Sequence, residues 1–131
     1  KHAALKGVDV RILVPDNIDH KMVWLAAFAY FDEVREVGAQ IWRYTDGFMH
    51  QKVVLVDDTL AAVGTSNMDN RSFILNFETM AVMFDARAAN DLEDMLKTDF
   101  ARAFKLEKSL SEQPLGIRVG APVTRLFSPL L

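Results

Sequence analysis

The sequence predicts an α/β fold in which a mixed and mostly buried β-sheet is flanked by helices on both faces. Short apolar runs with the spacing of strands alternate along the chain with longer segments whose apolar residues recur at helical spacing. Glycine, proline and aspartate residues punctuate the boundaries between these segments. Half of the 131 residues are apolar, which is enough for a packed core.

The N-terminal part of the chain is predicted to hold two helical segments and two strands. Gly7 ends the first helical segment, and Pro15 ends a strand in which apolar residues alternate. Asp19 is a candidate N-cap for a long helix, and Gly38 is expected at the C′ position of that helix. The predicted bounds are 1–6 for the first helix, 8–14 for the strand, 20–37 for the long helix and 39–44 for a second strand.

The central part is predicted to hold three strands, a short helix and a long helix. Residues 53–56 are all apolar, which is typical of a strand buried on both faces. Asp69 is expected to cap the short helix, and Asp85 the long one. The predicted bounds are 52–57, 60–63 and 77–84 for the strands, 64–67 for a loop, 69–75 for the short helix and 86–108 for the long helix.

The last 23 residues differ in composition from the rest, and we expect two regions: a domain at 1–108 and a partly irregular C-terminal tail at 109–131. The tail holds three of the four prolines and two of the six glycines. Its hydrophobic end is expected to pack along a neighbour that the chain lacks, and contact with a membrane is the alternative. We interpret the sequence, which starts at Lys1, as a fragment.

The composition excludes several classes of function. The formal net charge is −3, which argues against a duplex-DNA binder that relies on bulk charge. The chain has no cysteine, which rules out disulfide frameworks and thiolate metal sites. It also lacks a run of about 18 apolar residues that would span a membrane, so we expect the fragment itself to be soluble.

His50 and Lys52 are the strongest candidates for chemistry. Side chains two residues apart on a strand face the same side, so these two are expected to point into one pocket. A neutral imidazole is a nucleophile suited to phosphorus, and a lysine supplies a positive charge for phosphate oxygens. Phosphoryl chemistry needs mainly positioning and charge stabilisation, which this pair offers.

Three further residues extend the candidate site. Thr65 and Asn67 lie in a Gly-Thr-Ser-Asn loop and are expected to bind the same phosphate oxygens as Lys52. Glu78 lies near the start of a strand, and a carboxylate on the Nδ1 side of His50 would orient the ring and stabilise an imidazolium. Asp57 falls at odd spacing from His50, so on a regular strand it faces away from the pocket.

Aromatic residues and one arginine have two interpretations each. The helical spacing of Trp24, Phe28 and Phe31 favours core packing over a lipid-contacting stripe. Phe48, just before His50, either lines a substrate channel or fills the core. Arg71 either approaches a lipid headgroup or pairs with an acidic side chain.

Taken together, the motif residues form the pattern HxKx4Dx6GTSN, which closely resembles the HKD motif of the phospholipase D superfamily. The chain resembles, over nearly all its length, the second half of bacterial cardiolipin synthases. The segments that carry this resemblance are 7–15, 47–52, 67–73, 75–78 and 125–131.

The resemblance implies a mechanism in which two α/β halves, each with one HKD motif, share one active site. One histidine would form a phosphatidyl-histidine, and the other would protonate the departing alcohol and then activate the acceptor. Donor and acceptor would both be phosphatidylglycerol, with release of glycerol, at the bacterial inner membrane. The implied catalytic residues are His50, Lys52, Asp57 and Glu78, with Asp57 in a supporting role, and no metal or cofactor is implied.

The chain departs from this pattern in holding one HKD motif instead of two. His2 and His20 have no lysine two positions later, and one motif cannot supply both the nucleophile and the acid. The resemblance implies that some members of the superfamily solve this by forming homodimers. The natural partner would be the missing N-terminal half. The surface of the fragment that contacts this half would then be exposed and apolar, which would favour self-association of the fragment. Nucleic acid is not expected as a partner.

Two rival functions stay open at this point. The first is a different reaction on the same scaffold, in which a phospholipase D or a nuclease uses water as acceptor. The second is a folded half-domain that is inactive alone.

Overall fold

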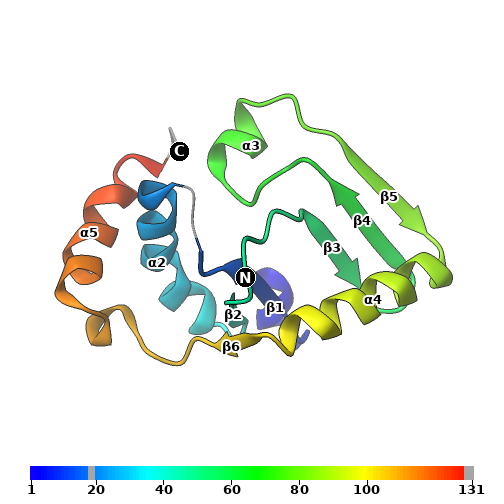
Figure 1. Cartoon of the computed structure of the whole chain (residues 1–131), viewed down its shortest axis with the longest axis horizontal. Coiled ribbons are helices and arrows are strands. Elements are labelled where there is room, and N and C mark those ends of the chain that lie inside the picture. Colours follow the sequence, from blue (N-terminus) through cyan, green and yellow to red (C-terminus); the bar gives the residue numbers. More distant parts are fainter. Residues whose placement is uncertain (18–19, 129–131) are drawn as a thin grey trace.

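The structure, a computed structural model, describes residues 1–17 and 20–128 (Figure 1). Its elements are, in chain order, α1 (His2–Leu5), β1 (Arg11–Pro15), α2 (Lys21–Arg35), β2 (Gln40–Tyr44), β3 (Val53–Val56), β4 (Leu60–Gly64), α3 (Asn70–Ile74), β5 (Met80–Phe84), α4 (Ala86–Phe100), β6 (Ala103–Lys105), the 3-10 turn η1 (Leu110–Glu112) and α5 (Leu115–Arg125).

The strands form two three-stranded sheets within the described residues. In the first sheet β2 lies between β1, to which it is parallel, and β6, to which it is antiparallel. The second sheet is antiparallel and has the order β3-β4-β5. Helix α4 contacts strands of both sheets, and α2 and α5 pack together beside the first sheet (Figure 1). The predicted α/β class with a mixed sheet is confirmed.

The N-caps of α3 and α4 are the residues that the sequence predicts. The side chain of Asp69 accepts a hydrogen bond from the backbone N–H of Ser72 at 2.7 Å, and that of Asp85 accepts one from Ala88 at 2.9 Å. Gly38 has φ 94°, a left-handed conformation that favours glycine. Helix α2 ends at Arg35 with Glu36 as its C-cap, so Gly38 lies one residue beyond the C′ position at which the sequence predicts it. The predicted N-cap Asp19 lies outside the described residues.

The main core cluster joins distant parts of the chain. Trp24 packs against this cluster, which contains Phe28 and Phe31 of α2, Ile41 of β2, Ala121 of α5, and Leu106, which directly follows β6. Core packing is therefore the correct interpretation of the aromatic residues of α2.

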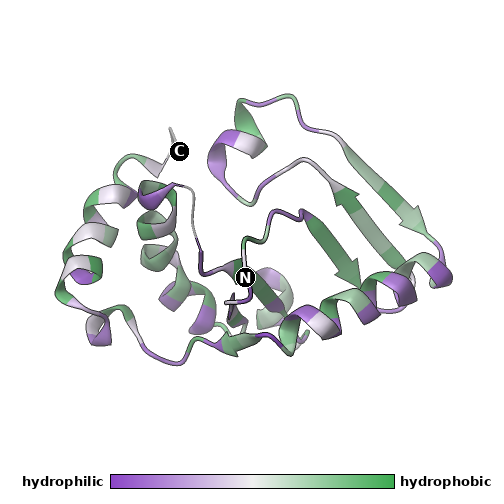
Figure 2. Cartoon of the chain, viewed as in Figure 1, coloured by the Kyte–Doolittle hydropathy of each residue, from purple (hydrophilic) through white to green (hydrophobic). Residues whose placement is uncertain are grey.

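The expectation that β3 is buried on both faces is wrong. Val54 and Val56 are exposed, and they share a face of the sheet with the exposed Val82 and Phe84 of β5. Helix α4 contacts this sheet, and the described residues leave the face of Val54 and Phe84 uncovered. Figure 2 shows the strands of this sheet coloured as hydrophobic almost throughout.

The long helix also ends earlier than predicted, at Phe100 instead of Lys108. Residues 103–105 form β6, which pairs with β2, and the N–H of Leu106 donates to the carbonyl of Ile41 at 2.8 Å. The open edge of β2 offers backbone partners that outweigh the helical tendency of this segment. The strands β1 and β5 are shorter at their starts than predicted, at Arg11 and Met80.

Residues 109–128 are more regular than a partly irregular tail, because they include η1 and α5. A capping box between Ser109 and Glu112 starts η1, and α5 then packs along α2. The helices approach so closely that a Cβ on Gly120 would lie 3.3 Å from the side chain of Leu25. The tail is ordered because its apolar face completes the same core, through Ala121, that α2 and β2 form.

No helix among the described residues combines the length and the apolar composition that crossing a bilayer requires.

Candidate active site

His50 and Lys52 lie next to each other immediately before β3. The Lys52 ammonium is 2.9 Å from Nδ1 of His50 and donates to the His50 carbonyl, also at 2.9 Å. The ring of Phe48 stacks on the imidazole, with 5.5 Å between ring centroids and 19° between planes. When Lys52 donates to Nδ1, the proton of the neutral ring is on Nε2. In this arrangement the lone pair of Nδ1 is engaged and Nε2 carries the proton.

Gly64, at the end of β4, connects the motif to the loop that follows. Its N–H donates to the Lys52 carbonyl at 3.0 Å, so the start of the loop lies opposite Lys52. A Cβ at Gly64 would overlap the carbonyl oxygen of Thr79 and the Cα of Met80. Glycine is required because β4 and β5 approach each other this closely.

Thr65 and Glu78 are joined directly. The Thr65 hydroxyl donates to Oε2 of Glu78 at 2.5 Å and accepts from the N–H of Thr79 at 3.0 Å, and the Asn76 amide donates to Oε1 of Glu78 at 3.1 Å. The Thr65 hydrogen bond, then that of Asn76, hold the pKa of Glu78 below its ordinary 4.5, and the charge of Lys52 contributes. Glu78 is therefore a fixed carboxylate at neutral pH.

These contacts bear on two predicted roles. The described partners of the Glu78 carboxylate include Thr65 and Asn76, while the contact at Nδ1 of His50 comes from Lys52. The orienting role of Glu78 toward His50 stays a prediction. The Thr65 hydroxyl proton is committed to Glu78, so binding of phosphate by this hydroxyl, which also stays a prediction, requires that it turn.

Asn67 and Asp57 lie at different distances from this group along the chain. Asn67 is exposed in the loop two residues after Thr65. Asp57 lies in the turn after β3, separated from Lys52 by the whole strand, and has a φ of 50°. The structure therefore brings His50, Lys52, Thr65 and Glu78 to one end of the second sheet and leaves Asp57 at the other.

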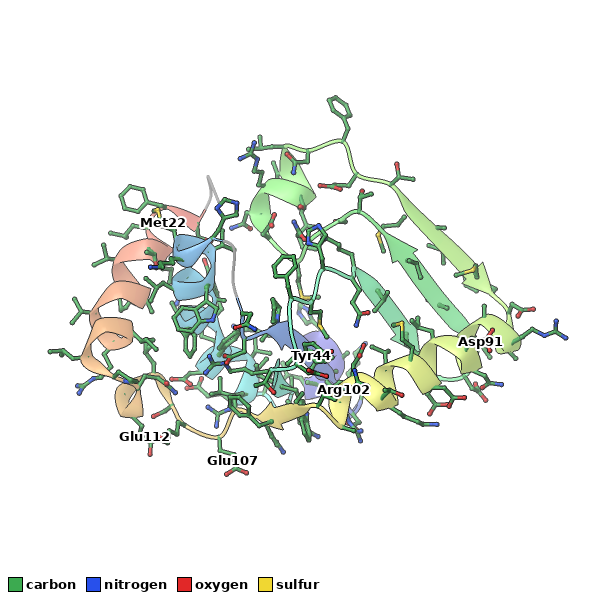
Figure 3. The ribbon with its side chains drawn as sticks, in the orientation of Figure 1. Met22, Tyr44, Asp91, Arg102, Glu107 and Glu112 are labelled. Carbon is green, nitrogen blue, oxygen red and sulfur yellow. The ribbon has the colours of Figure 1, made fainter. Side chains whose placement is uncertain are left out.

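One contact at this site has no signal in the sequence. The Gln51 amide donates to the carboxylate of Asp99, near the end of α4, at 2.8 Å. A cavity of about 160 Å³ opens there, lined by Tyr44, Phe48, Met49, His50, Gln51 and Asp99. Figure 3 labels Tyr44 beside Arg102 at this junction of the two sheets. Asp99 is 48 residues from Gln51, and no local pattern marks it.

In the described part of the chain, no group of three or more His, Asp and Glu side chains is arranged to hold a metal ion.

Comparison with protein families gives a direct result. The family described as "Cardiolipin synthase, PLD-like domain" matches residues 1–100. The chain belongs to this family. Among curated relatives, it is 46% identical to cardiolipin synthase A of Pseudomonas fluorescens over 130 residues, which is 98% of the chain and 27% of the relative. It is 43% identical to the cardiolipin synthase of Geobacillus thermodenitrificans, over 100% of the chain and 26% of the relative.

Two solved structures illustrate the similarity of the fold. Nuc, a phospholipase D family member from Salmonella typhimurium, superposes with a TM-score of 0.70 at 19% identity, over 82% of this chain and 70% of Nuc. Phosphatidylserine synthase of Haemophilus influenzae superposes with a TM-score of 0.67 at 16% identity, over 99% of this chain and 37% of the synthase. At these identities the likeness shows the fold alone. The chain spans about a quarter of the length of the curated cardiolipin synthases that it matches.

Proposed function

We propose that this chain is the C-terminal catalytic half of a cardiolipin synthase. The enzyme transfers a phosphatidyl group from one phosphatidylglycerol to a second and releases glycerol. The observation that carries the proposal is the His50–Lys52 pair beside the loop of Thr65, in a chain of the cardiolipin synthase family. This pair combines a nucleophile or acid with a phosphate-binding charge.

The proposed reaction has two displacements at phosphorus. In the first, the histidine nucleophile forms a P–N bond while the P–O bond to glycerol breaks, and the second histidine protonates the departing glycerol oxygen. In the second, a hydroxyl of another phosphatidylglycerol loses its proton to the second histidine and attacks the phosphorus. A new P–O bond forms, and the P–N bond to the nucleophilic histidine breaks. His50 is one of the two histidines. Lys52 and Asn67 bind the phosphate oxygens, Thr65 joins them once its hydroxyl turns, and Glu78 orients His50.

The second histidine must come from elsewhere, and we propose the N-terminal HKD half of the same protein. The chain spans only about a quarter of its relatives' length, which leaves room for such a half. The exposed apolar face of β3 and β5 is the surface that we propose the remaining protein covers. We propose a peripheral position for this catalytic domain at the cytoplasmic side of the cell membrane, where phosphatidylglycerol is available.

The test uses the full-length enzyme with phosphatidylglycerol liposomes. We expect cardiolipin and glycerol as products, and a loss of at least about a thousandfold in turnover for His50→Ala. The 131-residue chain alone should not turn over phosphatidylglycerol. Phosphatidic acid as the main product would indicate a phospholipase D instead, and nicking of plasmid DNA would indicate a nuclease. Full activity of His50→Ala would overturn the assignment of the site.

A further inference from the structure

Residues 68–77, between the loop at 64–67 and β5, expose their large apolar side chains to solvent. The five large apolar side chains have exposed fractions between 60% and 108%. They are Met68, Phe73, Ile74, Leu75 and Phe77. Isolated exposed apolar side chains are ordinary, but five within ten residues form a patch that is typical of an interaction surface.

This segment has a defined structure that is held by hydrogen bonds at its base and inside it. The N–H of Thr65 donates to the carbonyl of Thr79 at 3.0 Å, which together with the Thr65–Glu78 hydrogen bond closes its base. Inside it, the N–H groups of Leu75 and Asn76 both donate to the Arg71 carbonyl at 2.9 Å. The backbone of the segment is thus held by internal hydrogen bonds, while its large apolar side chains are exposed.

The charged side chains of the segment are also engaged internally. Asp69 caps α3, and the Arg71 guanidinium donates to the Asn76 side chain at 3.3 Å. Each of these two side chains is therefore held in place by a neighbour within the segment.

A cavity beside α3 extends the apolar surface toward α2. Its volume is about 250 Å³, and its lining includes Ala26 and Ala27 of α2 together with Met68 and Phe73. Of its polar side chains, Tyr30 and Asn70 hydrogen-bond to Ser128, and Asp69 accepts from the backbone N–H of Ser72. The walls that stay unpaired are apolar, and they suit a hydrocarbon occupant.

The position of this patch identifies its partner as a lipid surface. The phosphodiester of a membrane phospholipid lies at the boundary between headgroups and acyl chains. A protein surface that reaches this boundary buries its apolar side chains roughly 5–10 Å into it. The residues that flank the segment, Thr65 and Glu78, belong to the site proposed to bind that phosphodiester.

We propose that residues 68–77 dock on the bilayer, with Ile74 and Phe77 inserted among the lipids beside the active site. This proposal rests on the proposed function. The other exposed apolar surface, on β3 and β5, is a sheet face whose Phe84 pairs with Leu60, at the end of the sheet away from the Gly64–Met80 pair. It is assigned to contact with protein and serves as the internal control.

The test measures binding of the 131-residue chain to vesicles of phosphatidylglycerol and phosphatidylcholine by co-sedimentation. All variants carry His50→Ala, so that binding is read without turnover. Ile74→Ser and Phe77→Ser should each lower the vesicle partition coefficient between about tenfold and a hundredfold. The matched control Phe84→Ser, a side chain with a similarly high exposure of 81%, should leave it unchanged. Far-UV circular dichroism checks that each variant keeps its fold.

Three results would overturn the proposal. The first is unchanged vesicle binding of both segment variants, and the second is an equal loss in Phe84→Ser. The third is a change in sedimentation mass without a change in lipid binding, which would assign the patch to contacts between copies of the chain. Failure of the proposed function would look different, because the full-length enzyme would then form no cardiolipin although the segment still bound vesicles.

Discussion

At the residue scale, Asp57 differs most from what its place in the HKD pattern implies. It lies in the β3–β4 turn with φ 50°, in the left-handed region that aspartate tolerates better than β-branched residues. We propose that it shapes the turn that ends β3 and does not act on the substrate.

Substitution of Asp57 tests this assignment. Asp57→Asn should retain most activity in the full-length enzyme, because asparagine also tolerates the left-handed backbone conformation. Asp57→Val should lower the free energy of unfolding by roughly 1–2 kcal/mol, since a β-branched residue is strained at positive φ. Urea denaturation measures this, with Asp58→Val as control. A thousandfold loss of turnover in Asp57→Asn would return Asp57 to the catalytic residues.

The pair of Thr65 and Glu78 gives a prediction on acidity. Thr65→Val removes the hydrogen bond that contributes most to the low pKa of Glu78, so that pKa should rise toward 4.5. Carbon-detected NMR titration of the glutamate carboxyls measures it, and Thr65→Ser should keep the low pKa. A Glu78 pKa unchanged in Thr65→Val would show that other groups set it.

The same pKa fixes the direction of a pH effect. Because the pKa of Glu78 is lower in the folded chain than its ordinary 4.5, its hydrogen bonds stabilise the fold above pH 4.5. This contribution is lost as the pH falls through the folded-state pKa. Thr65→Val should therefore lose less stability than the parent chain on acidification below pH 4.5, as measured by thermal unfolding.

At the element scale, the close approach of β4 and β5 sets the position of the loop at 64–67. Gly64→Ala should lower the free energy of unfolding by about 1–3 kcal/mol, because the new Cβ overlaps backbone atoms of Thr79 and Met80. Gly116→Ala, in α5, meets no atom within 4 Å and should stabilise the chain slightly. Chemical denaturation of both variants measures the difference. Equal stability of the two would mean that the strands separate freely.

Sequence signals within a few residues predicted the helix starts at this scale, but they did not predict where α4 ends. Asp69 and Asp85 cap the N–H groups three residues on, which neighbours in sequence decide. The end of α4 at Phe100 depends on β2, a strand about 60 residues earlier in the chain, because the free edge of β2 pairs with β6. The order of the tail likewise depends on the surface that α2 offers to α5.

At the scale of the whole molecule, the uncovered face of β3 and β5 gives a prediction that compares the chain with the full-length enzyme. Val82→Lys should change the stability of the 131-residue chain by no more than about 0.5 kcal/mol, because Val82 is 51% exposed there. In the full-length enzyme it should cost about 2 kcal/mol or more if the remaining protein buries this face.

Thermal unfolding of both proteins measures this cost, and Thr59→Lys in the nearby turn is the control in each. Equal effects of Val82→Lys in the two proteins would show that the face is exposed in the enzyme and that the partner half docks elsewhere.

The sequence by itself determined the α/β class, the family and the residues of the candidate site. His50, Lys52, Thr65 and Glu78 stand out because the spacing of chemically suited side chains is a property of the chain alone. The structure decided which of them meet: Lys52 occupies Nδ1 of His50, Glu78 holds Thr65, and Gln51 reaches Asp99. It also decided that β3 has an open face and that the last helix belongs to the core. These outcomes depend on packing between segments that are distant in the sequence. The local pattern of a segment does not show which other segment packs against it.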